Sequence, residues 1–166
     1  VDGDGLSDLL IGANYNDDGG NNAGKSYLLL ASSIASGGTF SLSAADVSFV
    51  GENENDWSGG SVASAGDVDG DGLSDLLISA HYNHDGGSDA GKSYLFLASS
   101  IASGGTFNLS AADASFVGER TGDYSGYSVA SAGDVDGDGL SDLLIGAYGN
   151  GDRGSNAGKT YLFLAS

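Results

Sequence analysis

The amino-acid sequence predicts an all-β fold made of β-propeller blades, each with four antiparallel strands, and two observations support this prediction. Val1, Val68 and Val135 occupy equivalent positions, so a unit of 67 residues recurs and the 166-residue chain holds about two and a half units. Each unit contains four short apolar runs that are separated by clusters of Gly, Asn, Asp and Ser. Runs of this kind are typical of strands that are buried on both faces, as in a propeller blade.

The complete unit, residues 53–119, gives the expected strands in order. They are residues 61–68, 76–82, 93–98 and 114–118, the last with a hairpin partner near residues 106–109. Residues 1–52 are expected to form a partial blade that starts inside an acidic loop, and residues 120–166 a second partial blade.

Two and a half blades are too few to close a propeller, which takes about four to eight. An open blade leaves unpaired strand edges, so closure requires further repeats or other copies of the chain. Of these two arrangements, an excerpt from a longer tandem chain is favoured, because the first acidic loop lacks its first residue.

The acidic loop has the sequence DVDGDGLSD at residues 67–75, recurs unchanged at 134–142, and opens the chain without its first residue at 1–8. Its carboxylates stand at positions 1, 3, 5 and 9, where they repel one another unless a hard cation gathers their oxygens. Gly72 at position 6 permits a sharp turn, and the carbonyl at position 7 is a further ligand. The predicted calcium ligands are Asp2, Asp4, Leu6, Asp8, Asp67, Asp69, Asp71, Leu73, Asp75, Asp134, Asp136, Asp138, Leu140 and Asp142.

The loop differs from an EF-hand. An EF-hand has a Glu at position 12 and helices on both sides, whereas position 12 here is Ile78 or Ile145 and the flanking runs indicate strands. The alternative to a calcium site is a solvated acidic turn without an ion, in which the repulsion among four Asp residues would have to be tolerated in every copy.

Composition narrows the range of functions. The formal net charge is -18, with only five Lys and Arg, which argues against binding to nucleic acid and to anionic membranes. No apolar run approaches the ~20 residues of a membrane span, and no Cys is present for disulfides or thiol chemistry. Open calcium sites with affinities on the order of 10⁻⁴–10⁻³ M suit an extracellular or cell-surface location.

The segments GGSVASAGDVDGDGLSDLLISA at 59–80 and GYSVASAGDVDGDGLSDLLIGA at 126–147 resemble the FG-GAP repeats of integrin α-subunit propellers and their bacterial relatives. The shared pattern is DxDxDGxxD, and the resemblance spans the whole chain. The Pro of the family's GAP is replaced, because the three copies read GAN, SAH and GAY. The resemblance implies a seven-bladed propeller with calcium in hairpin loops at its lower rim.

These features together predict a calcium-stabilised structural or adhesive propeller repeat of a secreted or cell-surface protein. Its expected partners are calcium, other repeats or copies of itself, and protein or glycan ligands. Two alternatives stay open: a self-assembling extracellular filament, and a non-catalytic module of a secreted hydrolase or lyase. No catalytic arrangement of nucleophile and base is visible, so the chain is not expected to be an enzyme.

Three further patterns have a second interpretation. GxxxxGK[ST] at 19–26 and 86–93 matches a phosphate-binding loop, but a strand rather than a helix is expected to follow it. His81 and His84, with Asp85 and Asp89, could be imagined as a zinc or copper site, but variable exposed positions fit better. Trp57 and its equivalent Tyr124 could form a contact patch for sugars or proteins, although packing between neighbouring blades is the commoner role.

Overall fold

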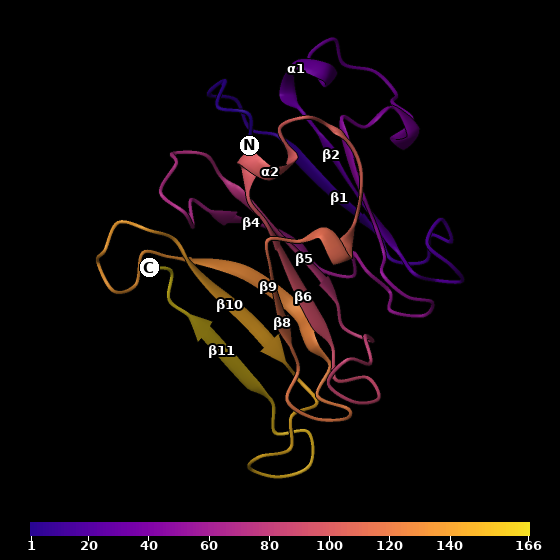
Figure 1. The fold of residues 1–166 in the computed structure, drawn as a ribbon, viewed down its shortest axis with the longest axis vertical. Helices are drawn as coiled ribbons and strands as arrows, with labels where there is room; N and C mark the ends of the chain where they lie inside the picture. Colours follow the sequence, from indigo (N-terminus) through magenta and orange to yellow (C-terminus); the bar gives the residue numbers. More distant parts are fainter.

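A computed structural model describes residues 1–166, and it shows three separate β-sheets joined by loops and very short helices (Figure 1). The middle sheet is one complete blade of four antiparallel strands in the order β4-β5-β6-β8. These strands are β4 (Val62–Gly66), β5 (Asp75–Ala80), β6 (Lys92–Phe96) and β8 (Ala114–Val117). The prediction of four strands in this unit is confirmed, with boundaries that differ by one or two residues.

The two outer sheets are partial blades. The first has the order β1-β2-β3-β7 and the third has the order β11-β10-β9. Their strands are β1 (Leu9–Ala13), β2 (Lys25–Leu29), β3 (Val47–Val50), β7 (Gly105–Asn108), β9 (Ser125–Gly133), β10 (Asp142–Ala147) and β11 (Lys159–Phe163). The short helices are α1 (Ala31–Ile34), α2 (Ala98–Ile101), η1 (Leu42–Ala44) and η2 (Leu109–Ala111). No helix is both long and apolar enough to cross a membrane.

The predicted hairpin between residues 106–109 and the fourth strand is wrong. The strand β7 instead leaves its own blade and pairs in parallel with β3 of the preceding blade, in the register Val47 with Gly105 through Val50 with Asn108. The ring of Phe107 lies 6.1 Å from that of Phe49 and 6.4 Å from that of Phe96, so the pairing also closes the core between the two blades. A hairpin would have removed this side chain from the core.

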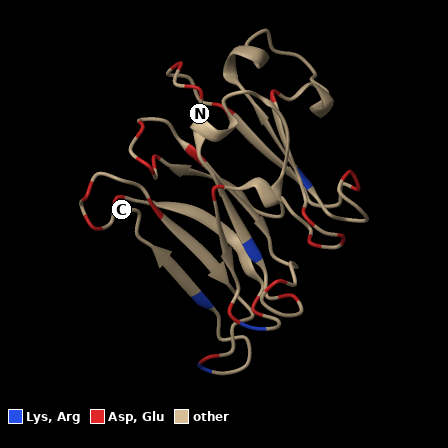
Figure 2. Ribbon diagram, viewed as in Figure 1, with Lys and Arg blue, Asp and Glu red and all other residues tan.

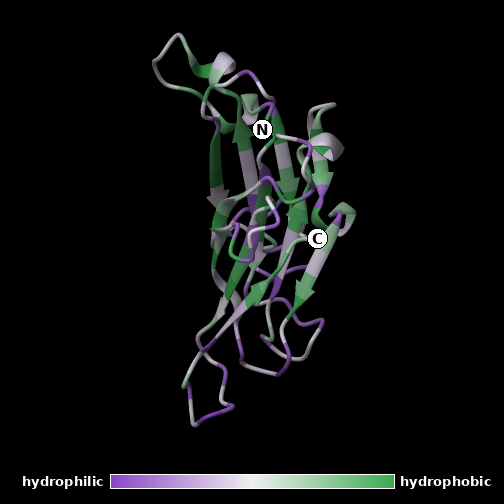
Figure 3. Cartoon of the chain, turned by 90° about the vertical axis from the view of Figure 1, so that its left-hand side faces the viewer, coloured by the Kyte–Doolittle hydropathy of each residue, from purple (hydrophilic) through white to green (hydrophobic).

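The blades pack face to face, and β5 supplies both faces of the middle one. Leu76, Ile78 and Ala80 belong to a cluster shared with the first blade, whereas Leu77 belongs to one shared with the third. Alternation of side chains along a strand explains this division. Figure 3 shows the hydrophobic colours concentrated on the strands and the hydrophilic ones on the loops. A blade of this sequence therefore needs a neighbour on each side.

The loops divide between the two ends of the strands. The three acidic loops lie at one end, before β1, between β4 and β5, and between β9 and β10 (Figure 1). The loops that join β1 to β2, β5 to β6 and β10 to β11 lie at the other end, together with all the Lys and Arg residues (Figure 2). The acidic loops are thus separated from every basic side chain.

The packing predicts that equivalent Leu residues differ in their contribution to stability. Leu95 is 6% exposed beneath the third blade, whereas Leu162, its equivalent in the third blade, is 45% exposed. We expect Leu95→Ala to lower the free energy of unfolding by about 2–5 kcal/mol, because it leaves a cavity. Leu162→Ala should cost about 1 kcal/mol or less. Urea unfolding of the two variants measures the difference, and equal losses would contradict the packing of blade on blade.

Candidate metal centres

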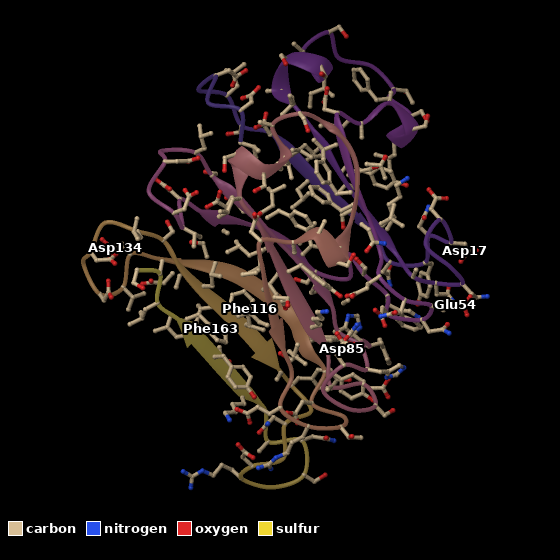
Figure 4. All side chains as sticks on the ribbon, in the orientation of Figure 1. Asp17, Glu54, Asp85, Phe116, Asp134 and Phe163 are labelled. Atoms are coloured by element: carbon tan, nitrogen blue, oxygen red, sulfur yellow. The ribbon has the colours of Figure 1, made fainter.

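Two of the acidic loops each bring three carboxylates together. Each of Asp67, Asp69 and Asp71 offers an oxygen, and these oxygens lie within 4.8 Å of one another. Asp134, Asp136 and Asp138 form the same group in the loop between β9 and β10. Figure 4 shows Asp134 on the outer loop, away from the labelled Asp17, Glu54 and Asp85 on the opposite side. Positions 1, 3 and 5 of both complete loops therefore converge as the sequence predicts.

The loop backbone folds around the same carboxylates. Asp67 accepts hydrogen bonds from the backbone N–H groups of Gly70 at 2.7 Å and Gly72 at 3.0 Å, and Asp71 accepts one from Leu73 at 2.8 Å. Gly72 has a φ of +85°, a conformation that Gly adopts without the steric cost a side chain would bring. These bonds hold the three Asp side chains on the inside of a tight turn.

The aspartate at position 9 has a different environment. Asp75 is fully buried, and its two oxygens accept hydrogen bonds from the N–H groups of Val68 at 2.8 Å and Ala98 at 2.9 Å. Asp142 repeats this with Val135 at 2.7 Å and Ala165 at 2.9 Å. Neither residue belongs to its group of three close carboxylates. Position 9 thus ties the acidic loop to the segment that follows the second strand after it.

Charge and burial act together on Asp75. Burial raises the pKa of its carboxyl group, the hydrogen bonds from Val68 and Ala98 oppose the rise, and the charges of Asp69 and Asp71 add to it. The net shift is upward. A cation among the three carboxylates at positions 1, 3 and 5 would reduce the repulsion between Asp75 and its neighbours as well as their mutual repulsion.

The first acidic loop forms only in part. Its Asp8 accepts hydrogen bonds from the chain's ammonium group at Val1, at 2.8 Å, and from the N–H of Ala31 at 2.9 Å. Burial acts to raise the pKa of Asp8, but the hydrogen bond and charge of the ammonium group, together with the backbone hydrogen bonds from Ala31 and Asp2, lower the pKa overall. Asp2 and Asp4 do not form a three-carboxylate group. This loop repeats the anchor at position 9 without the cluster.

The donor set of the two complete loops fits calcium. Carboxylate and backbone carbonyl oxygens are the ligands that Ca²⁺ prefers, and the ion tolerates irregular coordination. The carbonyl oxygens of Leu73 and Leu140 accept no hydrogen bond within the protein. Figure 2 shows no Lys or Arg residue on the backbone near either loop, and no salt bridge involves these Asp residues.

The opposite end of the strands carries polar contacts between repeats that sequence reasoning missed. The ammonium group of Lys92 lies 2.8 Å from Glu52 of the preceding repeat and 2.7 Å from Asp85 of its own. The Tyr94 hydroxyl donates to Glu52 at 2.8 Å. Desolvation acts to lower the pKa of Lys92, but the bonds to the two carboxylates raise it overall. The recurrence of Gly-Glu at 51–52 and 118–119 is the sequence feature that could have indicated a repeated contact of these Glu residues.

The same contacts recur at the next interface. Lys159 lies 2.9 Å from Glu119 and 3.1 Å from Asp152. A second pair also repeats, since the side-chain amide of Asn83 donates to Asp56 at 2.7 Å and that of Asn150 donates to Asp123 at 3.0 Å. Each of these two repeats therefore contacts its predecessor through a Lys–Glu ion pair, and its Asn binds an Asp in the loop that enters the blade from the preceding one.

These Lys residues also explain the motif that resembles a phosphate loop. Lys25, Lys92 and Lys159 are the first residues of β2, β6 and β11, so strands follow the GK pair, as the sequence predicts. The Gly before Lys92 packs so closely on the backbone of Ser125 that a side chain would not fit there. The GxxxxGK motif is therefore explained by close packing between repeats and not by a phosphate-binding helix.

Aromatic side chains gather on the same end. The Trp57 ring lies 4.9 Å from Tyr15 and 4.4 Å from Tyr82, and the Tyr124 ring lies 5.3 Å from Tyr82 and 5.2 Å from Tyr148. Trp57 and Tyr124 thus pack between neighbouring repeats, as expected. Their loop conformation is unusual, because both residues have positive φ angles, +54° and +51°.

The interpretation of His81 as an exposed, variable residue is wrong. His81 is only 9% exposed and packs against Tyr82 and Tyr127, which lowers its pKa through burial. His84 accepts a hydrogen bond from the N–H of Asp89 instead. The two His residues belong to no group of three close metal-ligating side chains. Tyr127 comes from the next repeat, so the sequence could not place His81 in the interior.

Similarity to known proteins agrees with this geometry. The family model described as FG-GAP repeat matches residues 1–29, 58–96 and 125–163, which is more than half of the chain. Integrin alpha-IIb of Homo sapiens is 33% identical over 156 residues. The match covers 90% of this chain and 14% of the integrin, so the chain spans a small part of that relative's length. The three matched segments include all three acidic loops.

The two kinds of Asp predict different responses to substitution. In Asp71→Asn, the amide oxygen can still accept from Leu73, so stability without calcium should hold or rise slightly as repulsion falls. In Asp75→Asn, the amide nitrogen would face a backbone N–H, which should cost about 1–3 kcal/mol with or without calcium. Chemical unfolding in EDTA measures both values. If the two variants lost equal amounts of unfolding free energy in EDTA, the hydrogen bonds of Asp75 would not anchor the loop.

Burial of His81 predicts a pH dependence. Its folded-state pKa lies below the ordinary value of 6.5, so below pH 6.5 the unfolded state takes up a proton that the folded state resists. Stability should therefore fall as the pH drops below 6.5, towards the lower folded-state pKa. His81→Asn, which copies Asn14 of the first repeat, is the control. Urea unfolding from pH 7.5 to 5.5 should show a steeper loss of unfolding free energy for the native chain than for His81→Asn. Parallel pH dependences of the two chains would exclude a contribution of His81.

Proposed function

Since this chain belongs to the FG-GAP repeat family, we propose that it is a calcium-stabilised structural and adhesive propeller module of a secreted or cell-surface protein. The observation that carries the proposal is the convergence of three carboxylates in each of two loops that contain no basic side chain. The module is non-catalytic. Its repeats provide a rigid scaffold, and its loops provide the contact surface.

Calcium supplies charge neutralisation to each loop when it is bound. Asp67, Asp69 and Asp71 would hold the ion together with the carbonyl of Leu73, and Asp134, Asp136, Asp138 and Leu140 would do so in the next repeat. The buried carboxylates at position 9 stay engaged with the backbone and set the loop's position between two strands. The ion would therefore stabilise the hairpin and, through Asp75, the start of α2.

The stabilisation of the folded state by calcium depends on the calcium concentration relative to the dissociation constant of each site. Extracellular sites bind with affinities on the order of 10⁻⁴–10⁻³ M, so such a site is largely filled outside the cell and empty in the cytosol. A ligand at ten times its dissociation constant stabilises the folded state by about 1.4 kcal/mol per site, and at a hundred times by about 2.7 kcal/mol. Two sites could thus supply a large part of the stability of a small domain.

The aromatic end of the molecule is the contact surface in this proposal. Tyr15, Tyr127 and Tyr148 are exposed and adjoin the more buried Trp57 and His81. An open hollow lies at this end of the molecule, and its lining residues include Trp57, His81, Tyr127 and Tyr148 together with Asn14 and Tyr82. Aromatic rings with polar neighbours suit contact with a protein or a glycan. The acidic loops at the opposite end leave this surface free.

Removal of calcium tests the proposal. We expect EDTA to lower the melting temperature, because the three carboxylates in each loop then repel one another without compensation. The control is a chain with both Asp69→Asn and Asp136→Asn, whose melting temperature should respond much less. Differential scanning calorimetry with 10 mM calcium, taken as about ten times the dissociation constant, and then with EDTA gives the comparison. An unchanged melting temperature in the native chain would reject calcium as a stabiliser.

A further inference from the structure

The two complete acidic loops are joined by a backbone hydrogen bond. We refer to residues 67–75 as the middle loop and to residues 134–142 as the third loop. The N–H of Ser141, at position 8 of the third loop, donates to the carbonyl oxygen of Asp67, at position 1 of the middle loop, over 2.7 Å. Figure 1 shows both loops at the same end of the strands. The two candidate metal centres are therefore connected directly, without passing through the core of either blade.

Side-chain packing accompanies this hydrogen bond. The Cδ2 atom of Leu140 lies so close to Gly70 that a Cβ atom added to Gly70 would be only 3.0 Å from it. Ser141 packs against Gly66 so closely that a side chain would not fit there. Residues 134–139 are all exposed, whereas Leu140 and Ser141 are half-buried. The C-terminal part of the third loop is thus docked on the middle loop.

The packing of Leu on Gly recurs between the first and middle loops. The Cδ2 atom of Leu73 would lie 2.9 Å from a Cβ atom added to Gly3. In both cases the Leu is at position 7 of one loop and the Gly is at position 4 of the loop before it. Gly3 and Gly70 have φ angles of +78° and +80°, which Gly adopts without the steric cost of a side chain. The contact is therefore a feature of the repeat.

The residues that join the loops are also candidate metal ligands. Asp67 directs its carboxylate to the middle cluster and its carbonyl oxygen to Ser141. Leu140 supplies a candidate carbonyl ligand in the third loop, and its side chain packs on Gly70. Ser141 is followed directly by Asp142, whose carboxylate accepts from two backbone N–H groups. A change of order in one loop therefore acts on ligand-bearing residues of the other.

We propose that the two calcium sites are coupled, so that calcium binding in one loop orders the neighbouring loop and raises its affinity for calcium. This inference rests on the proposed function, because it concerns the regulation of the calcium sites proposed there. Without an ion, repulsion among Asp67, Asp69 and Asp71 favours more open conformations of the middle loop. An ion that gathers these residues fixes the carbonyl of Asp67, which is the acceptor for Ser141.

The coupling follows from the entropy of ordering. A third loop that is already held by the middle loop loses less conformational freedom when its own ion binds. Because binding free energies are reciprocal, the third loop raises the affinity of the middle loop by the same factor. Charge acts in the opposite direction, since one bound cation weakens the attraction for a second, but salt at about 0.15 M screens charges beyond about 8 Å. The direct contacts therefore decide the sign, and we expect about a fivefold gain or more.

Hydrogen exchange tests whether order passes from one loop to the other. In a chain with Asp136→Asn and Asp138→Asn, the third loop loses two of its three close carboxylates and only the middle loop can hold calcium. We expect calcium to slow exchange in the peptide that contains Ser141 about fivefold or more. The two substitutions also distinguish this peptide by mass from the otherwise identical residues 67–75.

The control chain carries Asp69→Asn and Asp71→Asn as well, so that neither loop holds calcium, and its exchange should not respond. Protection of the middle loop without protection of Ser141 would overturn the coupling and leave calcium binding intact. Protection of Ser141 in the control chain would also overturn it, because residual binding in the third loop would then be the cause. If calcium slowed exchange in neither loop of the first chain, calcium binding itself would be rejected, and the coupling with it.

A matched pair of variants tests the packing contact. Leu140→Ala keeps the backbone carbonyl but removes the side chain that packs on Gly70, whereas Leu73→Ala makes the same change against Gly3, whose loop has no cluster of three carboxylates. Calorimetric titration of the native chain with calcium should give a Hill coefficient above 1, with an upper limit of about 2 for two sites. Leu140→Ala should lower this coefficient towards 1, and Leu73→Ala should not. A coefficient of 1 or less in the native chain, or equal changes in the two variants, would contradict the proposal.

Discussion

The structure depends on one constraint, which is that both faces of a blade are apolar. Strand β5 directs Leu76 and Ile78 towards one neighbour and Leu77 towards the other, so burial of one face alone leaves the other in water. Face-to-face packing of consecutive repeats satisfies both faces. The centroids of the Phe116 and Phe163 rings lie 4.5 Å apart across one such interface, and both residues are labelled in Figure 4. A single repeat would be a poor folding unit for this reason, and stability is shared between neighbours.

Polar contacts fix how the apolar faces align. Hydrophobic packing is not directional, and sheets with similar side chains could slide past one another. The Glu52 carboxylate meets both Lys92 and Tyr94, and Asn83 reaches Asp56 beside them. Hydrogen bonds to charged groups with little exposure are strict in geometry and costly to break. These contacts, with the crossover strand β7, define the register of one blade on the next.

The acidic loops have two separable roles that share one sequence motif. The carboxylates at positions 1, 3 and 5 converge near the surface, where no Lys or Arg neutralises their charge. The carboxylate at position 9 is buried and satisfied by two backbone N–H groups. The motif DxDxDGxxD therefore combines a candidate ion site with a structural link between a strand and the segment after the next one.

The sequence by itself determined the repeat length, the all-β class, the four strands of the middle blade and the loops where carboxylates converge. These features are local, since they depend on the spacing of residues within one unit. Only the tertiary structure decided that β7 pairs with the preceding blade, that His81 is buried and that Glu52 binds Lys92. Each of these depends on which residues of different repeats come together, and the spacing of residues within one repeat does not specify this. The physical reason is that strand pairing and burial require a partner surface, and residues distant in the sequence supply it.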